Sequence, residues 1–209
     1  MRSISAIPLL CFLFLFHFCS CTTPEFKNKE AEEAHDFDKK SPVIFDVIKI
    51  RPEPRIETFW SGSMPDFIIC EASGLTRSRA YQGVSYWKRL GYPILNIRHV
   101  RDSPECRTDY EKGKVVVKLI NNSIPINQNL AVTKVYYHRE TRVIQGASIY
   151  LIGGYANKPR LIEHEIGHAL GWKHYPRNLH IMHPEYDNTG SSSSGMTYRK
   201  YLDLISNFL

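Results

Sequence analysis

Residues 164–174 of this chain read HEIGHALGWKH, and this stretch decides how the rest of the sequence is interpreted. His164 and His168 are four residues apart, so on a helix they lie on one face, one turn apart, and can bind one metal ion together. Glu165 directly follows the first histidine and is placed to act on a water molecule at that metal. The spacing therefore predicts a helix that carries two metal ligands and one catalytic carboxylate.

The end of the same stretch supplies a third ligand. Gly171 tolerates the left-handed backbone conformation that ends helices, so the chain can turn there and bring His174 back to the metal. Three neutral imidazoles around Zn²⁺ leave a fourth coordination position open, which is typical of a catalytic site and not of a structural one. We therefore expect one catalytic zinc ion, bound by His164, His168 and His174, with Glu165 as the general base.

A second motif follows, because residues 181–186 read IMHPEY. Together the two motifs resemble the metzincin metallopeptidases, whose signature is HExxHxxGxxH followed by a turn that contains a methionine. The resemblance makes Met182 the methionine that supports the site from below without binding the metal. Among metzincins the chain is most similar to the matrixins, which place proline two residues and tyrosine four residues after this methionine. Pro184 and Tyr186 would then form the wall of the pocket for the substrate side chain after the scissile bond.

The resemblance covers roughly residues 65–209 and implies an α+β fold. This fold would have a mixed, twisted five-stranded sheet, two main helices, a zinc cleft, and a small C-terminal subdomain with the methionine turn and a closing helix. A peptide substrate would lie extended along an edge strand at Val132–Tyr137. The chain departs from the matrixins in lacking the Pro-Arg-Cys-Gly propeptide motif, and Tyr175 after the third histidine fits none of the best-known subfamilies.

The apolar pattern of the chain predicts secondary structure in the same order as this family. A capping threonine, Thr76, and a stop glycine, Gly91, bound one predicted helix. The closing helix is expected to bury a stripe formed by Tyr198, Leu202, Ile205 and Leu209. We expect strands at residues 66–70, 94–100, 114–120, 130–137 and 142–152, and helices at residues 76–90 and 196–209.

Residues 1–21 have the composition of a signal peptide. Arg2 precedes an apolar run at residues 7–18, which is shorter than the roughly 20 residues of a membrane-spanning helix. The run ends in FCSC, which resembles a lipoprotein box with Cys21 as the lipidated residue; ordinary signal cleavage near Cys21 is the alternative. We expect an extracytoplasmic protein, either secreted or anchored to a membrane by lipid.

Residues 22–60 are expected to precede the catalytic domain as a flexible tether or a pro-segment. Residues 22–41 are charged and polar with few apolar side chains, so they cannot bury enough surface to offset the entropy of ordering. Residues 41–60 combine an apolar run with prolines, which fits either a short strand or a pro-segment that crosses the cleft. The catalytic domain is then predicted at residues 61–209.

The five cysteines divide into two groups. Cys11, Cys19 and Cys21 belong to the signal segment, where they are removed or lipidated. Cys70 and Cys106 remain as an even pair in an extracytoplasmic protein. Neighbouring parallel strands would bring these two to the same sheet edge, so we favour a disulfide over two free buried thiols.

The composition limits the other classes of function. The net charge of +6 is spread along 209 residues without a block of lysine and arginine or a nucleic-acid motif, so no nucleic-acid partner is expected. The chain is predicted to be a monomeric zinc-dependent endopeptidase that hydrolyses peptide bonds of extracytoplasmic protein or peptide substrates. A catalytically inactive zinc-binding surface protein or adhesin is the alternative, and the intact Glu165 argues against it.

Overall fold

The computed structural model describes residues 53–120 and 129–208, which belong to one compact unit. The signal segment, Cys21 and residues 22–52 lie outside the described residues. In the described part, no helix is both long enough and apolar enough to cross a membrane. The elements are β1 (Asp66–Cys70), α1 (Arg77–Arg89), β2 (Ile97–Val100), β3 (Lys114–Leu119), β4 (Ala131–Tyr137), β5 (Ile144–Leu151), α2 (Leu161–Ala169) and α3 (Tyr198–Ile205).

The five strands form one mixed sheet in the order β2-β1-β3-β5-β4. The first four strands of this order are parallel, and β4 joins β5 as an antiparallel hairpin at the end of the sheet. This architecture confirms the predicted α+β fold with a mixed five-stranded sheet. It leaves β4 as an edge strand next to the helix that carries the histidine motif.

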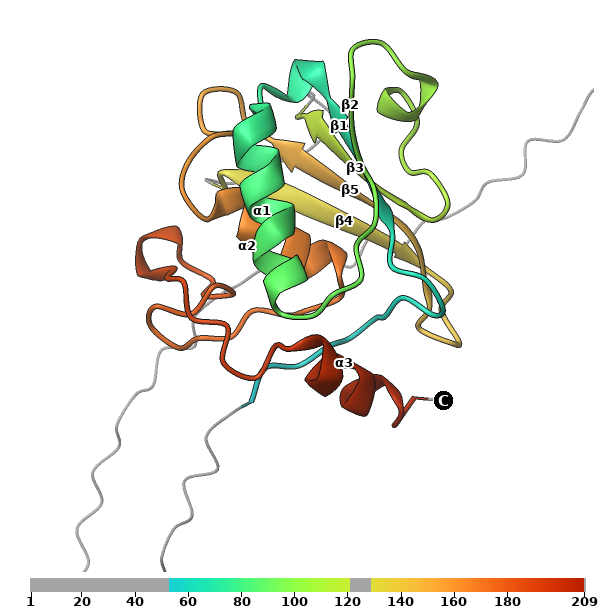
Figure 1. Ribbon diagram of the computed structural model, residues 1–209, viewed down its shortest axis with the longest axis vertical. Coiled ribbons are helices and arrows are strands. Elements are labelled where there is room, and N and C mark those ends of the chain that lie inside the picture. Colours follow the sequence, from blue (N-terminus) through green and yellow to red (C-terminus); the bar gives the residue numbers. More distant parts are fainter. Residues whose placement is uncertain (1–52, 121–128, 209) are drawn as a thin grey trace, which may run out of the picture. The chain divides into compact units, whose positions relative to one another are not determined.

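The two faces of the sheet are covered differently. Side chains alternate along a strand, so Phe67 and Ile69 point into the main core while Ile68 between them points to a smaller apolar cluster on the other face. Figure 1 shows α1 and α2 together on one face of the sheet, where the main core lies. Burial on both faces explains why β1 and β3 read as continuous apolar runs in the sequence.

A disulfide closes the cluster on the second face. Cys70 at the end of β1 is bonded to Cys106, with 5.9 Å between their Cα atoms. Cys106 lies in the connection between β2 and β3, so the bond ties this connection to the sheet. Of the two alternatives for this pair, the structure contains the disulfide. For a loop of 36 residues, the chain-entropy estimate of its stabilisation is about 4 kcal/mol.

The predicted ends of α1 are confirmed, whereas β2 is shorter than predicted. The Thr76 hydroxyl accepts the backbone N–H of Arg79 at 3.3 Å, and Gly91 follows the helix with φ of +92°. The sequence placed the start of the next strand at Ile94, but its N–H donates to the carbonyl of Tyr92 at 2.9 Å in a tight turn. Strand pairing therefore begins only at Ile97.

The closing helix is also shorter than predicted, and its buried stripe differs. The α3 helix starts after Thr197, whose hydroxyl accepts the N–H of Lys200, and its buried residues are Tyr201 and Ile205. Leu202, which the predicted stripe included, is 42% exposed. An apolar period alone could not detect that the polar Tyr201 hydroxyl would find a buried partner. The last residue of the predicted stripe, Leu209, lies outside the described residues.

Residues 53–60 form an extended segment, here called the N-terminal strap, which packs into the compact unit. Ile56, Phe59 and Trp60 are buried in the main core. Figure 1 shows the strap passing alongside α3, and the backbone N–H of Trp60 donates to the Tyr201 hydroxyl at 2.8 Å. The compact unit therefore includes residues that the sequence analysis assigned to the tether or pro-segment.

Candidate metal centre

The three motif histidines converge on one point. The Nε2 atom of His168 lies 3.0 Å from Nε2 of His164 and 3.1 Å from Nε2 of His174, and all three candidate ligand atoms lie within 4.8 Å of one another. Tetrahedral ligands placed about 2.1 Å from a zinc ion would be about 3.4 Å apart. The spacing of the three nitrogens is therefore close to that of a single metal site.

Two backbone carbonyls fix which nitrogen of each helical histidine faces this point. Nδ1 of His164 lies 2.8 Å from the carbonyl oxygen of Ile181, and Nδ1 of His168 lies 2.8 Å from that of Trp172. A carbonyl oxygen can only accept, so each Nδ1 carries the proton and each Nε2 presents a lone pair. Two lone pairs 3.0 Å apart repel each other unless a cation lies between them. The donor set thus fits a metal ion.

The electrostatic surroundings keep these imidazoles neutral. Burial lowers the pKa of His168 well below its ordinary value, and the neighbouring His164 and His174 lower it further. Burial also lowers the pKa of His164, and burial followed by the charges of His164 and His183 lowers the pKa of His174 to about 4. Neutral imidazole is the form that binds a metal, so the site is ready for one at neutral pH.

Glu165 follows His164 on α2, and burial and one hydrogen bond shift the pKa of its carboxylate in opposite directions. Its residue is 6% exposed, and burial raises the pKa of Glu165 to about 7. The Thr133 hydroxyl on β4 donates to Oε2 of Glu165, which acts in the opposite direction and lowers this pKa. A carboxylate with a pKa near neutrality can both accept and return a proton at physiological pH.

The turn that brings back the third histidine depends on the N-terminal strap. Gly171 has φ of +101°, and a Cβ at this position would overlap the carbonyl oxygen of Thr58. The Gly171 carbonyl accepts the N–H of Glu57 at 3.2 Å, and the N–H of Lys173 donates to the carbonyl of Arg55 at 2.9 Å. The strap thus pairs with the three residues that precede His174.

Met182 lies directly under the middle of α2. It is fully buried, and a Cβ on Gly167 would overlap its sulfur atom and come within 2.9 Å of the Trp87 ring. Gly167 is therefore required by close packing in the core, in a helix interior where glycine would otherwise be unfavourable. The carbonyl of the preceding residue, Ile181, accepts from His164, so this segment both supports the helix and orients one of its imidazoles.

The two residues expected to line a substrate pocket follow Met182 on the same segment. Pro184 is exposed, and Tyr186 is half-buried with its hydroxyl donating to the carbonyl of Pro159 at 2.9 Å. The ammonium group of Lys158 lies 4.9 Å from the centre of the Tyr186 ring. Tyr186 therefore packs against the segment that leads into α2.

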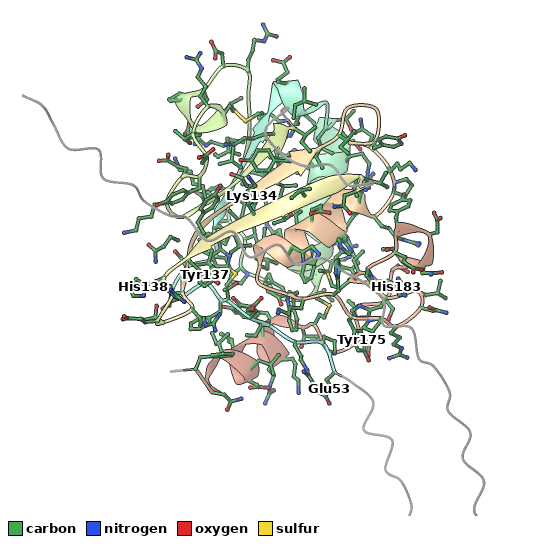
Figure 2. All side chains as sticks on the ribbon, turned by 180° about the vertical axis from the view of Figure 1, so that it is seen from behind. Glu53, Lys134, Tyr137, His138, Tyr175 and His183 are labelled. Carbon is green, nitrogen blue, oxygen red and sulfur yellow. A yellow bond between two sulfur atoms is a disulfide. The ribbon has the colours of Figure 1, made fainter. Side chains whose placement is uncertain are left out.

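Two further histidines near the site make structural hydrogen bonds. Nδ1 of His180 accepts the N–H of Met182 at 3.2 Å, and Nδ1 of His183 accepts the N–H of Glu185 at 3.1 Å. Figure 2 labels His183 and Tyr175 on the same side of the molecule, and the Tyr175 N–H donates to the Met182 carbonyl at 2.8 Å. These contacts shape the segment between the third histidine and the candidate pocket residues.

The sequence predicted no role for Thr133, and it predicted that residues 41–60, which include the strap, form a short strand or a pro-segment. Strand alternation could have placed Thr133 on the face of β4 that carries the buried Ala131, whereas the next residue, Lys134, is exposed. Figure 2 shows Lys134 and Tyr137 on β4, with His138 in the turn that follows. The strap carries no comparable pattern, because its hydrogen bonds with Gly171 and Lys173 are made by backbone atoms.

Comparisons with known proteins give little further information. No protein-family model matches the sequence, and no curated protein matches it. The chain is similar to the solved structure of metalloproteinase-II from Bacteroides fragilis, with 12% identity and a TM-score of 0.43. The match covers 74% of this chain, and the chain spans only 57% of the length of that protein. A likeness this low supports no conclusion about function.

Proposed function

We propose that this protein is a zinc-dependent endopeptidase of the metzincin type. The observation that carries the proposal is the convergence of three neutral imidazoles next to a buried carboxylate. His164, His168 and His174 present nitrogen lone pairs to one point. Glu165 follows the first of them on α2 and has its pKa raised to about 7. A purely structural zinc site would need four protein ligands and no such base.

In this proposal the protein residues divide the work of hydrolysis. The three histidines would hold the ion, and Glu165 would accept a proton from the attacking water and return it to the leaving amine. A zinc ion bound there would polarise the scissile carbonyl and acidify a water molecule. Met182 would support the histidines from below through its contact with Gly167.

We also propose where a substrate binds. The outer edge of β4 has no partner strand within the described residues, so an extended peptide could add to it by backbone hydrogen bonds. Pro184 and Tyr186 would form the wall of the pocket for the side chain after the scissile bond. We further propose that the protein acts as a monomer outside the cytoplasm, does not bind nucleic acid, and is either secreted or anchored by lipid at Cys21.

The test is zinc-dependent cleavage of an unstructured protein such as casein by the purified protein. Chelation should abolish cleavage and added zinc should restore it. Glu165→Gln keeps the shape of the side chain but cannot accept the proton, so this variant should retain zinc while turnover falls by about 10² or more.

Two results would contradict the proposal in different ways. Comparable activity in Glu165→Gln would reject the role of Glu165. Stoichiometric zinc without cleavage of casein or of a peptide library would favour the alternative, an inactive zinc-binding surface protein or adhesin.

A further inference from the structure

We propose that Thr133 is a positioning residue for Glu165, and this inference rests on the proposed peptidase function. The Thr133 hydroxyl donates to Oε2 of the Glu165 carboxylate. In doing so it would hold one oxygen of the carboxylate and leave the other, Oε1, free to take the proton from the attacking water. The role concerns orientation of the base, since the hydrogen bonds of the Thr133 hydroxyl go to Glu165.

The sheet places Thr133 where it can do this. β4 is the last strand of the sheet, and it packs against α2. Thr133 is paired with Ile149, which is fully buried in the main core beneath the helices. The side chain of Thr133 therefore points to the helix side of the sheet and reaches the turn of α2 that contains Glu165.

The hydrogen bonds of this pair leave one carboxylate oxygen unused. A threonine hydroxyl has one proton to donate, and both acceptors within its reach belong to Glu165: the Oε2 atom and the backbone carbonyl oxygen, the latter at 3.3 Å. Within residues 53–120 and 129–208, no other side chain or backbone group donates to the carboxylate.

A buried carboxylate with a single donor depends strongly on that donor for its orientation. Without the Thr133 hydroxyl, Glu165 would sit in a desolvated site with no group to select one rotamer over another. Small errors in the placement of a catalytic group reduce rates by up to about 10²-fold. Because the substrate is proposed to add to the edge of β4, the same strand would position both the peptide and the base that acts on it.

The experiment compares two variants at this position with a matched control. Thr133→Val keeps the shape of the side chain and removes the donor, whereas Thr133→Ser keeps the donor. Thr141→Val makes the same chemical change in the exposed turn of the same hairpin, where the hydroxyl only accepts the N–H of Val143 at 3.4 Å. The kcat of Thr133→Val should fall by about 10- to 100-fold, with KM and zinc content unchanged. Thr133→Ser should retain most of the activity, and Thr141→Val should behave like wild type.

A second measurement does not depend on activity. In the metal-free protein, Thr133→Val leaves the buried carboxylate without its donor, so we expect the Tm to fall by about 2–4 °C. The same substitution in a Glu165→Ala background should change the Tm by less, because the acceptor is already gone. The double-mutant cycle thus tests the contact between the two side chains directly.

Several outcomes would overturn the inference. These are an unchanged or increased kcat in Thr133→Val, a change confined to KM, a Thr133→Ser variant as slow as Thr133→Val, or no coupling in the stability cycle. If the wild-type protein cleaves nothing, the proposed function fails, and the stability cycle alone then decides whether Thr133 orients Glu165.

Discussion

Helix α2 and the N-terminal strap hold the same site in different ways. The helix supplies His164 and His168 as side chains on one face, four residues apart. The strap supplies no ligand, and its backbone pairs with the turn that leads to His174. Residue types reveal the role of the helix, whereas the strap pairs with this turn through backbone groups that every residue has. One segment of a site can therefore be recognised from its residue types, while the site also depends on another segment whose residue types do not indicate that role.

The strap also completes the end of the helix. The indole Nε1–H of Trp60 donates to the carbonyl of Ala169 at 2.9 Å, across 109 residues of sequence. The last carbonyls of a helix lack partners within it, so this bond satisfies one of them. The backbone N–H of the same Trp60 donates to Tyr201 of α3. One residue of the strap thus joins the histidine helix to the closing helix.

Removal of the strap is the most severe way to break this arrangement. A protein shortened to residues 61–209 loses Ile56, Phe59 and Trp60 from the core, each worth about 2–5 kcal/mol. Their sum approaches the whole stability of a typical domain, about 5–15 kcal/mol. We expect no cooperative thermal unfolding and no tight zinc binding, whereas a protein of residues 48–209 should show both. A cooperative transition in the shorter protein would mean that the strap is dispensable.

Gly171→Ala should disrupt the contact between the strap and the turn that follows α2, while the rest of both segments stays in place. The substitution puts a side chain at φ of +101° and drives its Cβ into the Thr58 carbonyl. We expect a loss of about 3 kcal/mol or more in the free energy of unfolding, with weaker zinc binding measured by chelator competition. The control is Gly154→Ala, which has φ of +83° and open space around the added Cβ. Equal losses in the two variants would show that contact with the strap adds nothing to backbone strain.

Gly167→Ala should disturb the packing of α2 on Met182, with a smaller loss in the free energy of unfolding. The added Cβ would overlap the Met182 sulfur, and overpacking in a core costs about 1–3 kcal/mol. Alanine regains up to about 1 kcal/mol in a helix interior, so the net loss should be about 0–3 kcal/mol by thermal unfolding. Adding Met182→Ala makes room for the Cβ, so the two losses should not be additive. Strict additivity would contradict the close contact.

Lys173→Ala should have the smallest effect and would sharpen the distinction between side-chain and backbone contacts. Lys173 forms an ion pair with Glu57 of the strap at 2.9 Å, but both side chains are about half exposed. Pairs of this kind contribute about 0–1 kcal/mol. Because the backbone bond from Lys173 to Arg55 remains, zinc affinity should not change. A marked loss of zinc affinity would show that the strap acts through this charge pair.

Much of the fold and of the site could be predicted because its signals are local. The spacing of His164 and His168 follows from the helical period, and Thr76 and Gly91 mark helix ends through their own backbone preferences. Short apolar runs predicted the strands, and the resemblance to the metzincins implied that they form a mixed sheet. The even pair Cys70 and Cys106 favoured a disulfide before their positions were known.

Only the tertiary structure decided which groups complete the site. The sequence could not show that Thr133 would reach Glu165, because that contact joins β4 to α2, which are distant in the sequence. It placed residues 53–60 outside the domain, since three buried apolar side chains among prolines and charges have no regular period. The sequence identifies the residues that can bind a metal, because they are spaced only a few residues apart. The positions of those residues depend on backbone hydrogen bonds and close contacts between distant segments, and these carry no signature in residue type.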